Sequence, residues 1–232
     1  MKFSILLLGF LLLPGGGDPP RYQLDELTGH FQPASHPQFR VLKNKHTTKP
    51  RAYLREEVYR AFRKMWRAAR RDGHGLKIVS ATRNFRRQAA IWNGKWNASP
   101  LPPGPSRARH ILRYSSMPGT SRHHWGTDLD INALNNAYFE SGKGKEIYEW
   151  MQENAADFGF YQPYTAYNGY RDTGYREEKW HWSYYPLARD LQRAYLHLIR
   201  DEDLQGFQGA GHASSLKVIN NYVRSVAAPP ES

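Results

Sequence analysis

Residues 118–130 read PGTSRHHWGTDLD, and residues 173–182 read TGYREEKWHW. From Trp125 to Ile131, and again from Lys179 to Tyr184, polar and apolar side chains alternate, which predicts two half-buried strands. Histidines and carboxylates occupy these strands and the turns that precede them. These two stretches therefore predict a small sheet that carries a cluster of metal-binding side chains.

A zinc site that catalyses hydrolysis takes about three protein ligands, mostly His nitrogens and a carboxylate, and leaves one position open for water. His123 at the end of a turn, Asp130 on the following strand and His181 on the other strand can converge on one ion. Glu178 lies three residues before His181, where a local bend rather than a helix would bring its carboxylate to the water. The pattern indicates a zinc hydrolase with Glu178 as the proton acceptor.

Spacing alone leaves two choices open. His124 competes with His123, and Asp128 competes with Asp130 because residues i and i+2 share one face of a strand. The chain contains no cysteine, which excludes disulfides, Cys-ligated zinc, iron–sulfur clusters and thiol catalysis. Any metal site must therefore use His, Asp or Glu.

Outward from these motifs, apolar residues recur at helical spacing in several segments. The first predicted helix begins near Leu54 and ends at Gly73, and the second is capped by Asn84 and runs through Trp92. A third has an apolar face that starts at Ile147, and it ends at Gly159. A fourth opens at Pro186, and a fifth covers Leu216–Val226. Residues 76–80 read as a strand, and the Pro-rich residues 93–106 read as a loop. Helices and strands mix without βαβ repetition, so we expect an α+β fold in which helices flank a small antiparallel sheet.

The N-terminal residues have the pattern of an export signal. Lys2 precedes an apolar run of about 11 residues, Phe3–Leu13, and small residues follow, as in a secretory signal peptide. This run is shorter than the ~20 residues of a membrane-spanning helix. We therefore expect a signal peptide at 1–17, an extended lead-in at 18–50, and a mature protein that is exported to the bacterial cell envelope, periplasmic or extracellular, without stable membrane insertion.

The positive charge is concentrated in one part of the chain. The formal net charge is +12, from 33 Lys and Arg against 21 Asp and Glu. Residues 40–90 hold 16 Lys and Arg against 3 acids, a local charge of +13. Such a patch fits a polyanion or an anionic substrate, and otherwise a solvated helix face.

The motifs resemble those of VanY-type D-alanyl-D-alanine carboxypeptidases, members of the LAS metallopeptidase superfamily. The pattern S-x-H-x-x-G-x-x-x-D is present as Ser121, His123, Gly126 and Asp130. The pattern E-x-W-H is present as Glu178, Trp180 and His181. The resemblance covers about residues 75–190 and implies the LAS/Hedgehog-type fold. It also implies that one zinc ion per chain is bound by His123, Asp130 and His181, with Glu178 as the catalytic base.

An upstream segment completes the resemblance. The family tends to show S-G-Y-R-S followed by a Gln, and this chain has Ser80-Ala81-Thr82-Arg83-Asn84 and then Gln88. The resemblance implies that Arg83 grips the terminal carboxylate of a peptide, aided by Gln88 and Ser121. The alternative is that Arg83 merely belongs to a basic surface. Where many relatives carry Ala, this chain has Asp128, whose carboxylate could orient His123 or His124.

The resemblance implies a zinc-dependent carboxypeptidase in a domain at 51–205, which removes the terminal D-amino acid from peptidoglycan stem peptides. A C-terminal extension with one helix is expected at 206–232. One alternative is an endopeptidase of the same superfamily. Another is a non-catalytic, zinc-stabilised wall-binding module, against which the presence of Glu178 speaks. We expect a monomer that does not bind nucleic acid, since no nucleic-acid motif accompanies the basic patch.

The aromatic residues beside the motifs have two interpretations. Trp125, Trp180 and Trp182 are expected to pack the sheet and the walls of the site, and sugar stacking is the alternative. Tyr161, Tyr164 and Tyr175 are candidates for a hydrogen bond to a reaction oxyanion, and the sequence does not choose among them.

Overall fold

The computed structural model describes residues 22–169 and 171–229, so the expected signal peptide at 1–17 lies outside the described residues. Its main sheet is four-stranded, with the strand order β3 (Ile78–Ser80), β4 (Asp128–Ile131), β6 (His181–Tyr184) and β5 (Phe160–Tyr161). All of its strand pairs are antiparallel. A second, two-stranded sheet pairs β1 (Phe39–Val41) with β2 (Tyr53–Arg55). The predicted α+β class with a small antiparallel sheet is confirmed.

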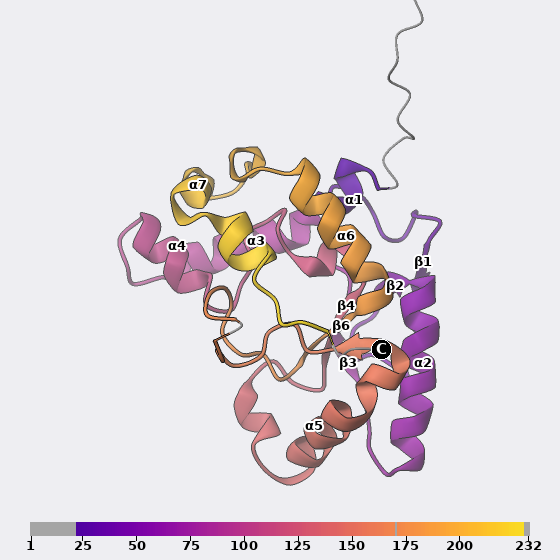
Figure 1. Cartoon of the computed structure of the whole chain (residues 1–232). Helices are drawn as coiled ribbons and strands as arrows, with labels where there is room; N and C mark the ends of the chain where they lie inside the picture. Colours follow the sequence, from indigo (N-terminus) through magenta and orange to yellow (C-terminus); the bar gives the residue numbers. More distant parts are fainter. Residues whose placement is uncertain (1–21, 170, 230–232) are drawn as a thin grey trace, which may run out of the picture.

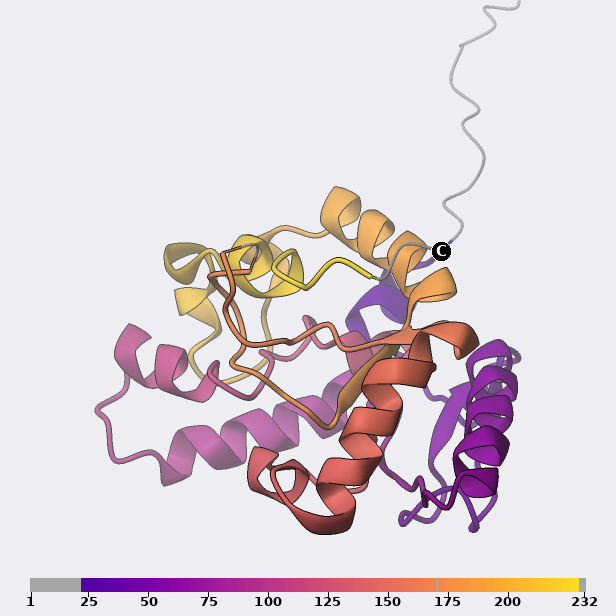
Figure 2. The same ribbon diagram turned by 60° about the horizontal axis from the view of Figure 1, so that its bottom comes forward.

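The two faces of the main sheet differ in chemistry. Leu129, Ile131 and Trp182 point into a hydrophobic core shared with α2 (Glu56–Arg71) and α5 (Gly142–Asn154). Since side chains alternate along a strand, Asp128 and Asp130 of β4 share the opposite face. That face meets a second layer, formed by α1 (Leu24–Thr28), α3 (Phe85–Ala98), α4 (Pro105–Ile111), α6 (Tyr185–Leu198) and α7 (Ala213–Leu216) (Figures 1 and 2).

Several helices lie where periodicity and capping predict them. In α3 the Asn84 side chain accepts a hydrogen bond from the backbone N–H of Arg87, which is the expected N-cap. α5 continues into a 3-10 turn, Ala155–Phe158, which ends at Gly159 with φ of 80°. α6 carries Pro186 in its first turn, where a missing N–H costs nothing.

Three local predictions are wrong at their edges. Leu54 lies in β2, so the helix predicted from Leu54 begins only at Glu56. The segment 93–106 is not one loop, because α3 continues to Ala98 and Pro105 opens α4. The strand predicted from Trp125 begins at Asp128, after a 3-10 turn that extends from Arg122 to Trp125.

The chain on either side of the expected 51–205 domain contributes to the same cores. Residues 22–50 are not extended throughout, since they form α1 and β1 and bury Leu27 and Phe39. Beyond residue 205 the single helix predicted at 216–226 is replaced by α7 and a separate π-helical turn, Ile219–Val223. Leu216 and Val218 pack with residues of α3, α4 and α6 in the second core. Within the described ranges, no helix is long and apolar enough to cross a membrane.

Candidate metal centre and substrate cavity

The first motif folds as a tight turn that leads into β4. Ser121 precedes the 3-10 turn, and Gly126 ends it in the left-handed region with φ of 72°. A Cβ atom at Gly126 would also collide with the ring of Phe39. Only glycine avoids both the backbone strain and this contact, so the motif requires it there.

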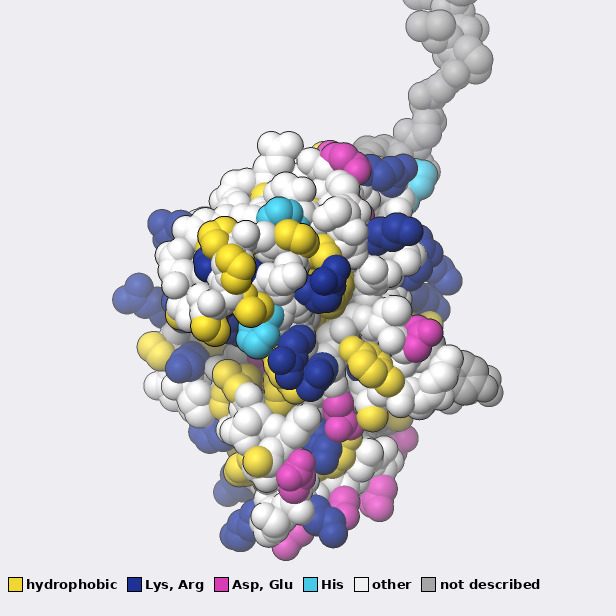
Figure 3. Space-filling view, turned by 90° about the vertical axis from the view of Figure 1, so that its left-hand side faces the viewer, with side chains coloured by type: hydrophobic (Ala, Val, Ile, Leu, Met, Phe, Trp, Pro, Cys, Tyr) yellow, Lys and Arg dark blue, Asp and Glu magenta, His cyan; other side chains and the backbone are white. Residues whose placement is uncertain are grey.

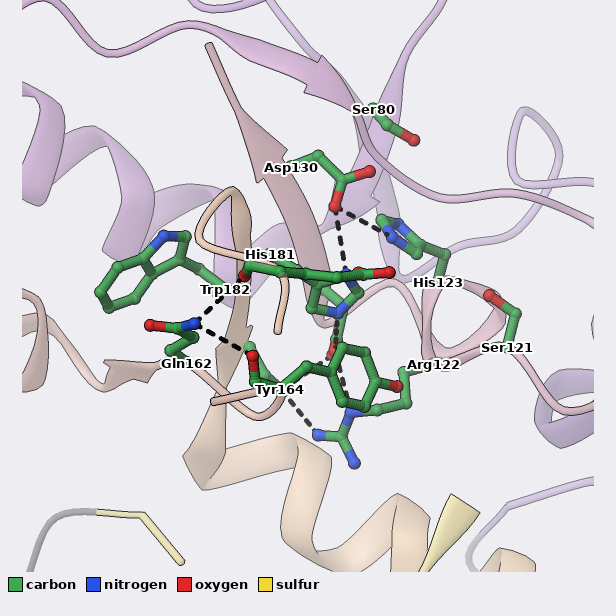
Figure 4. A network of polar contacts seen from close by, with 12 residues as sticks. Ser80, Ser121, Arg122, His123, Asp130, Gln162, Tyr164, His181 and Trp182 are labelled. Atoms are coloured by element: carbon green, nitrogen blue, oxygen red, sulfur yellow. Dashed lines mark hydrogen bonds and ion pairs between the residues drawn. The ribbon is translucent and has the colours of Figure 1, made fainter. Parts of the chain in front are cut away.

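The sheet register then brings the predicted ligands together. Asp130 pairs with His181 across β4 and β6, and the preceding turn places His123 beside them. Asp130 Oδ1 lies 3.1 Å from His181 Nδ1 and 3.4 Å from His123 Nε2. One ligand atom from each residue lies within 4.8 Å of the others, and all three side chains are buried. Figure 4 shows the two imidazoles turned toward the Asp130 carboxylate.

The remaining ring nitrogens are hydrogen-bonded elsewhere. His123 Nδ1 lies 2.9 Å from the carbonyl oxygen of Ala81, to which it must donate. His181 Nε2 lies 2.9 Å from Asp128 Oδ2. These contacts place the proton of each neutral ring on the outer nitrogen and leave the inner nitrogen with a free lone pair. Metal-binding histidines are commonly oriented in this way.

Asp128 is the partner of His181, and not of His123 or His124 as the sequence suggested. Its Oδ2 also accepts from Arg122 Nε at 2.9 Å. Its Oδ1 accepts from the hydroxyls of Thr127 at 2.7 Å and Ser183 at 2.8 Å. Burial alone would raise the pKa of Asp128, but Arg122 and His181 hold it well below the usual value. The carboxylate is therefore ionised and fully hydrogen-bonded, and it orients the His181 ring.

The cluster fits a divalent cation on its own chemistry. Asp130 Oδ1 is buried and makes no hydrogen bond of good geometry with any described residue. Burial lowers the pKa of His181, but the adjacent carboxylates of Asp128, Asp130 and Glu178 outweigh it and hold that pKa well above its ordinary value. A site that crowds carboxylates around an imidazole attracts positive charge. Two His nitrogens with one carboxylate oxygen are a donor set that zinc accepts.

Glu178 stands beside the cluster in a bend, as predicted. The backbone N–H of His181 donates to the Glu178 carbonyl, closing a turn rather than a helix. The Glu178 carboxylate is buried, and its Oε2 lies 3.4 Å from His181 Nδ1. Burial raises the pKa of this carboxyl above its ordinary value. A carboxylate with a raised pKa is a better proton acceptor near neutral pH.

A cavity of about 570 Å³ opens onto the cluster and is lined by every residue predicted for the site. The Arg83 guanidinium donates to Ser80 Oγ at 2.9 Å and to Ser121 Oγ at 3.5 Å, and its Nη1 lies 3.8 Å from Asp130 Oδ2. Gln88 is buried, donates to the Ser116 carbonyl and leaves its own Oε1 without a partner among the described residues. Arg83 therefore lies within the site and not on a basic surface.

His124 has a structural contact pattern. Its Nδ1 lies 2.6 Å from the carbonyl oxygen of Arg83, and its Nε2 accepts from the Gly119 N–H at 3.1 Å. Burial lowers its pKa to about 3, so the ring is neutral. Both nitrogens are occupied by backbone groups, and the ring ties the Arg83 loop to the metal-binding turn. Of the two rings, that of His123 is the one that lies beside Asp130 and His181.

Among the cavity-lining residues that sequence reasoning missed, two have charged side chains, Lys95 and Arg122. Lys95 lines the cavity on the same side of α3 as Gln88, seven residues and two helical turns later. The periodicity would have shown this if the helix had not been ended at Trp92. Arg122 is buried and bonds both Asp128 and Ser183. In the sequence, the only indication of a role for Arg122 was its position inside the first motif.

The aromatic residues divide as walls and core. Trp180 lines the cavity, whereas Trp125 and Trp182 lie in the two hydrophobic cores. Of the tyrosines, Tyr164 and Tyr175 line the cavity and Tyr161 does not. The Tyr164 ring centroid lies 4.7 Å from that of His181. Tyr164 and Tyr175 therefore remain the candidates for an oxyanion contact.

Known proteins are similar to this chain in sequence. Over 138 residues the chain is 32% identical to YodJ of Bacillus subtilis, which bears a provisional carboxypeptidase name; the match covers 57% of this chain and 46% of that protein. Over 120 residues it is 32% identical to a D-alanyl-D-alanine carboxypeptidase of Enterococcus faecalis, covering 50% of this chain and 42% of that protein. The chain thus spans less than half the length of these relatives.

Solved structures agree on the fold. A Zn(II) complex of the vancomycin resistance D,D-pentapeptidase VanY aligns with a TM-score of 0.52 at 25% identity, covering 72% of this chain and 89% of that chain. The LD-carboxypeptidase LdcB aligns with a TM-score of 0.53 at 24% identity, covering 81% of this chain and 78% of that chain, which shows the fold alone. The family model described as VanY, D-alanyl-D-alanine carboxypeptidase, matches residues 51–187. Since this segment contains the whole main sheet and both motifs that meet on it, the chain belongs to the VanY family.

Proposed function

We propose that the protein is a zinc-dependent carboxypeptidase that removes the terminal D-amino acid from peptidoglycan stem peptides. The observation that carries the proposal is one cavity in which the His123, Asp130 and His181 cluster lies beside the guanidinium of Arg83. Arg83 Nη1 is only 3.8 Å from a carboxylate oxygen of Asp130. A cation so close to the cluster suits a substrate whose free carboxylate adjoins the bond to be cut.

His123 Nε2, His181 Nδ1 and Asp130 Oδ1 are the atoms that would hold the zinc ion. When bound there, zinc would act as a Lewis acid on the scissile carbonyl and lower the pKa of a water molecule toward about 7. Asp128 keeps the His181 ring in the required tautomer through its hydrogen bond to Nε2.

Glu178 is the proposed general base and then the general acid. Its carboxylate accepts a proton as the water oxygen attacks the scissile carbonyl carbon. When the C–N bond breaks, the same group delivers the proton to the leaving amine. Its burial supports both roles, since the raised pKa brings its proton affinity closer to neutral pH.

Arg83 is the proposed carboxylate clamp. A guanidinium binds a carboxylate through two parallel hydrogen bonds, which fixes the orientation of the leaving residue. Arg83 Nε is buried without a partner among the described residues. Ser121 Oγ and Gln88 Oε1 line the same cavity and complete the predicted substrate contacts.

The place of action is part of the proposal. The N-terminal pattern supports export of the mature enzyme to the cell envelope, where its proposed substrate lies. Peptidoglycan stem peptides carry free carboxylates, which suit the Arg83 guanidinium in the cavity.

The decisive assay incubates purified mature protein with defined muropeptides, with and without a chelator, and identifies the products by mass. We expect the loss of one terminal D-Ala, its abolition by the chelator and its recovery on addition of zinc. Internal fragments would instead establish an endopeptidase. No product from any substrate would favour a non-catalytic wall-binding module.

The ligand set is tested by metal content. His181→Ala removes one of the nitrogen donors, so the variant should lose bound zinc and all activity. Elemental analysis of the parent should give one zinc per chain. A variant that kept one zinc per chain would show that the ligand set is wrong.

A further inference from the structure

A second hollow lies at the C-terminal end of α2, away from the catalytic cavity. It has a volume of about 330 Å³. We name it the Trp66 cleft, and its lining holds three Lys or Arg residues and one His but no Asp or Glu. The lining residues are Lys45, Trp66, Arg70, Gly73, His74, Gly75, Leu76 and Lys77.

The cations of the Trp66 cleft are held by neutral groups. Lys45 Nζ lies 5.3 Å from the centroid of the Trp66 ring, and the Arg70 guanidinium lies 5.4 Å from it. These are cation–π distances, at which the ring attracts a positive charge. Lys77 Nζ donates to the carbonyl oxygen of Asn44 at 3.2 Å. None of the three has a carboxylate within ion-pair distance among the described residues, so their charge is positioned but not neutralised.

Neighbouring charges strengthen the positive field. The outer face of α2 carries five further exposed cations, Arg60, Arg63, Lys64, Arg67 and Arg71. The buried ring of His46, packed edge-on against Trp66, reports this field, since burial and then nearby Lys and Arg side chains lower its pKa to about 4. Figure 3 shows another face of the molecule, on the side of α3 and α4, where Lys and Arg are also exposed and most Asp and Glu side chains lie toward the lower part of the view.

The cleft has the chemistry of a polyanion site and not of a membrane surface. A helix that binds a bilayer exposes apolar side chains on its bound face. Apart from Ala61 and Trp66, which are partly buried, the apolar residues of α2 are buried in the core, and Leu76 of the cleft is only 1% exposed. A polar ligand with repeated negative groups matches both the charge and the length of this face.

The cleft and the catalytic cavity are separate sites near the two ends of β3. Lys77 precedes β3 and Arg83 follows it, six positions later along the chain, which is at most about 22 Å of extended chain. The two linings share no residue, so a ligand in the cleft leaves the cavity free. Parts of one polymer that lie about 2 nm apart can occupy both.

We propose that the Trp66 cleft and the outer face of α2 bind the carboxylate-bearing chains of polymeric peptidoglycan and hold the enzyme on the wall while the cavity cuts a neighbouring stem. The choice of polymer rests on the proposed function; the polyanion site itself rests on the geometry of the cleft. Binding should depend steeply on salt, as it does when several ion pairs form with a polyanion.

The test compares two triple variants with equal loss of charge. One neutralises the cleft, Lys45→Gln, Arg70→Gln and Lys77→Gln. The matched control neutralises exposed arginines elsewhere, Arg109→Gln, Arg193→Gln and Arg224→Gln. Co-sedimentation with purified insoluble sacculi, and separately with vesicles of anionic phospholipid, measures affinity at low and moderate salt. Cleavage of a soluble stem peptide measures the catalytic cavity, and thermal unfolding checks the fold.

We expect the cleft variant to bind sacculi at least tenfold more weakly than the parent, with a shallower salt dependence, and the control to lose less than threefold. Both should cleave the soluble peptide within twofold of the parent. Equal binding by both variants would overturn the proposal, as would a loss confined to vesicles of anionic phospholipid. If the cleft variant unfolds, Lys45→Gln alone, at an exposed loop position, should still weaken binding. A parent that cleaves no peptide refutes the proposed function, and sacculus binding still tests the cleft.

Discussion

The position of Glu178 allows its proposed role as the base to be tested separately from metal binding. Its carboxylate reaches His181 but is not part of the three-residue cluster. Glu178→Gln keeps the shape and removes the base, so kcat should fall by about 10²- to 10⁴-fold. Zinc content should stay at one per chain. Steady-state kinetics with elemental analysis checks this, and loss of zinc together with activity would contradict the base assignment.

Asp128 acts on the cluster only through His181. Asp128→Asn keeps the volume but replaces an ionised acceptor of four hydrogen bonds by an amide. We expect zinc affinity to fall by about 10- to 100-fold, the usual range for partners of metal-binding histidines. Competition with a chromophoric chelator measures it. Ser214→Ala, an exposed change in α7, is the control. Unchanged affinity in Asp128→Asn would remove the positioning role.

At the scale of elements, strand alternation and strand register do different work. Alternation puts Asp128 and Asp130 on one face of β4 and Leu129 on the other. Register decides what each carboxylate meets, because Asp130 pairs with His181 and Asp128 pairs with Ser183. A slip of one residue would exchange the faces and place both carboxylates in the hydrophobic core. Burial of the apolar face of the sheet therefore fixes the register of β4, and the register fixes the geometry of the site.

The contact of α2 with the loop that precedes β2 makes stability depend on acid pH. His46 is buried, and its Nδ1 lies 2.7 Å from the Tyr59 hydroxyl. Its pKa is about 4 in the folded protein and about 6.5 in the unfolded chain. The unfolded chain therefore binds more protons between these values, and the free energy of unfolding falls as pH drops from about 6.5 to 4. Above pH 6.5 this contribution is constant.

His46→Gln removes that titration. Its melting temperature should fall less between pH 7 and pH 5 than that of the parent, even if it is lower at pH 7. His197→Gln, at an exposed position of α6, should retain the parental slope. Thermal unfolding followed by circular dichroism across this pH range provides the measurement. Parallel slopes for all three proteins would show that His46 does not cause the acid sensitivity.

At the scale of the whole molecule, the segment beyond residue 205 packs into the second hydrophobic core. Leu216 is 6% exposed and packs in the same core as Trp92 and Tyr195. Leu216→Ala should lower the free energy of unfolding by about 2–5 kcal/mol, the cost of a cavity in a packed core. Asn220→Ala, at an exposed position, should change it by less than about 0.5 kcal/mol. Urea denaturation with tryptophan fluorescence measures both. A cost no larger than that of the control would mark the segment as a separate appendage.

The distribution of charge is also a property of the whole molecule. The sequence places 16 Lys and Arg between residues 40 and 90, and Arg83 is one of them. In the structure α2 and α3 lie on opposite sides of the sheet (Figure 1), and Arg83 is the one member of that run that lines the catalytic cavity among the described residues. The field of α2 therefore faces away from the proposed substrate clamp. Because of this separation, an anionic group bound at α2 does not compete with the carboxylate that Arg83 is proposed to bind.

The sequence by itself determined the features that depend on residues close together in the chain. The candidate ligands, the base at Glu178 and the clamp at Arg83 were identified from short motifs, and the structure gathers all of them in one cavity, although their roles stay predictions. Helical periodicity and the Asn84 cap located most helices, because these signals arise within one or two turns.

Only the tertiary structure decided the partners. Asp128 orients His181 because antiparallel register sets β4 beside β6, and His124 is occupied by backbone groups of two separate loops. Lys95 enters the cavity because packing against the second core extends α3 past Trp92. These outcomes depend on contacts between segments far apart in the chain, which local patterns do not encode. The absence of cysteine left His, Asp and Glu as the donors, and the sheet determined which of them meet.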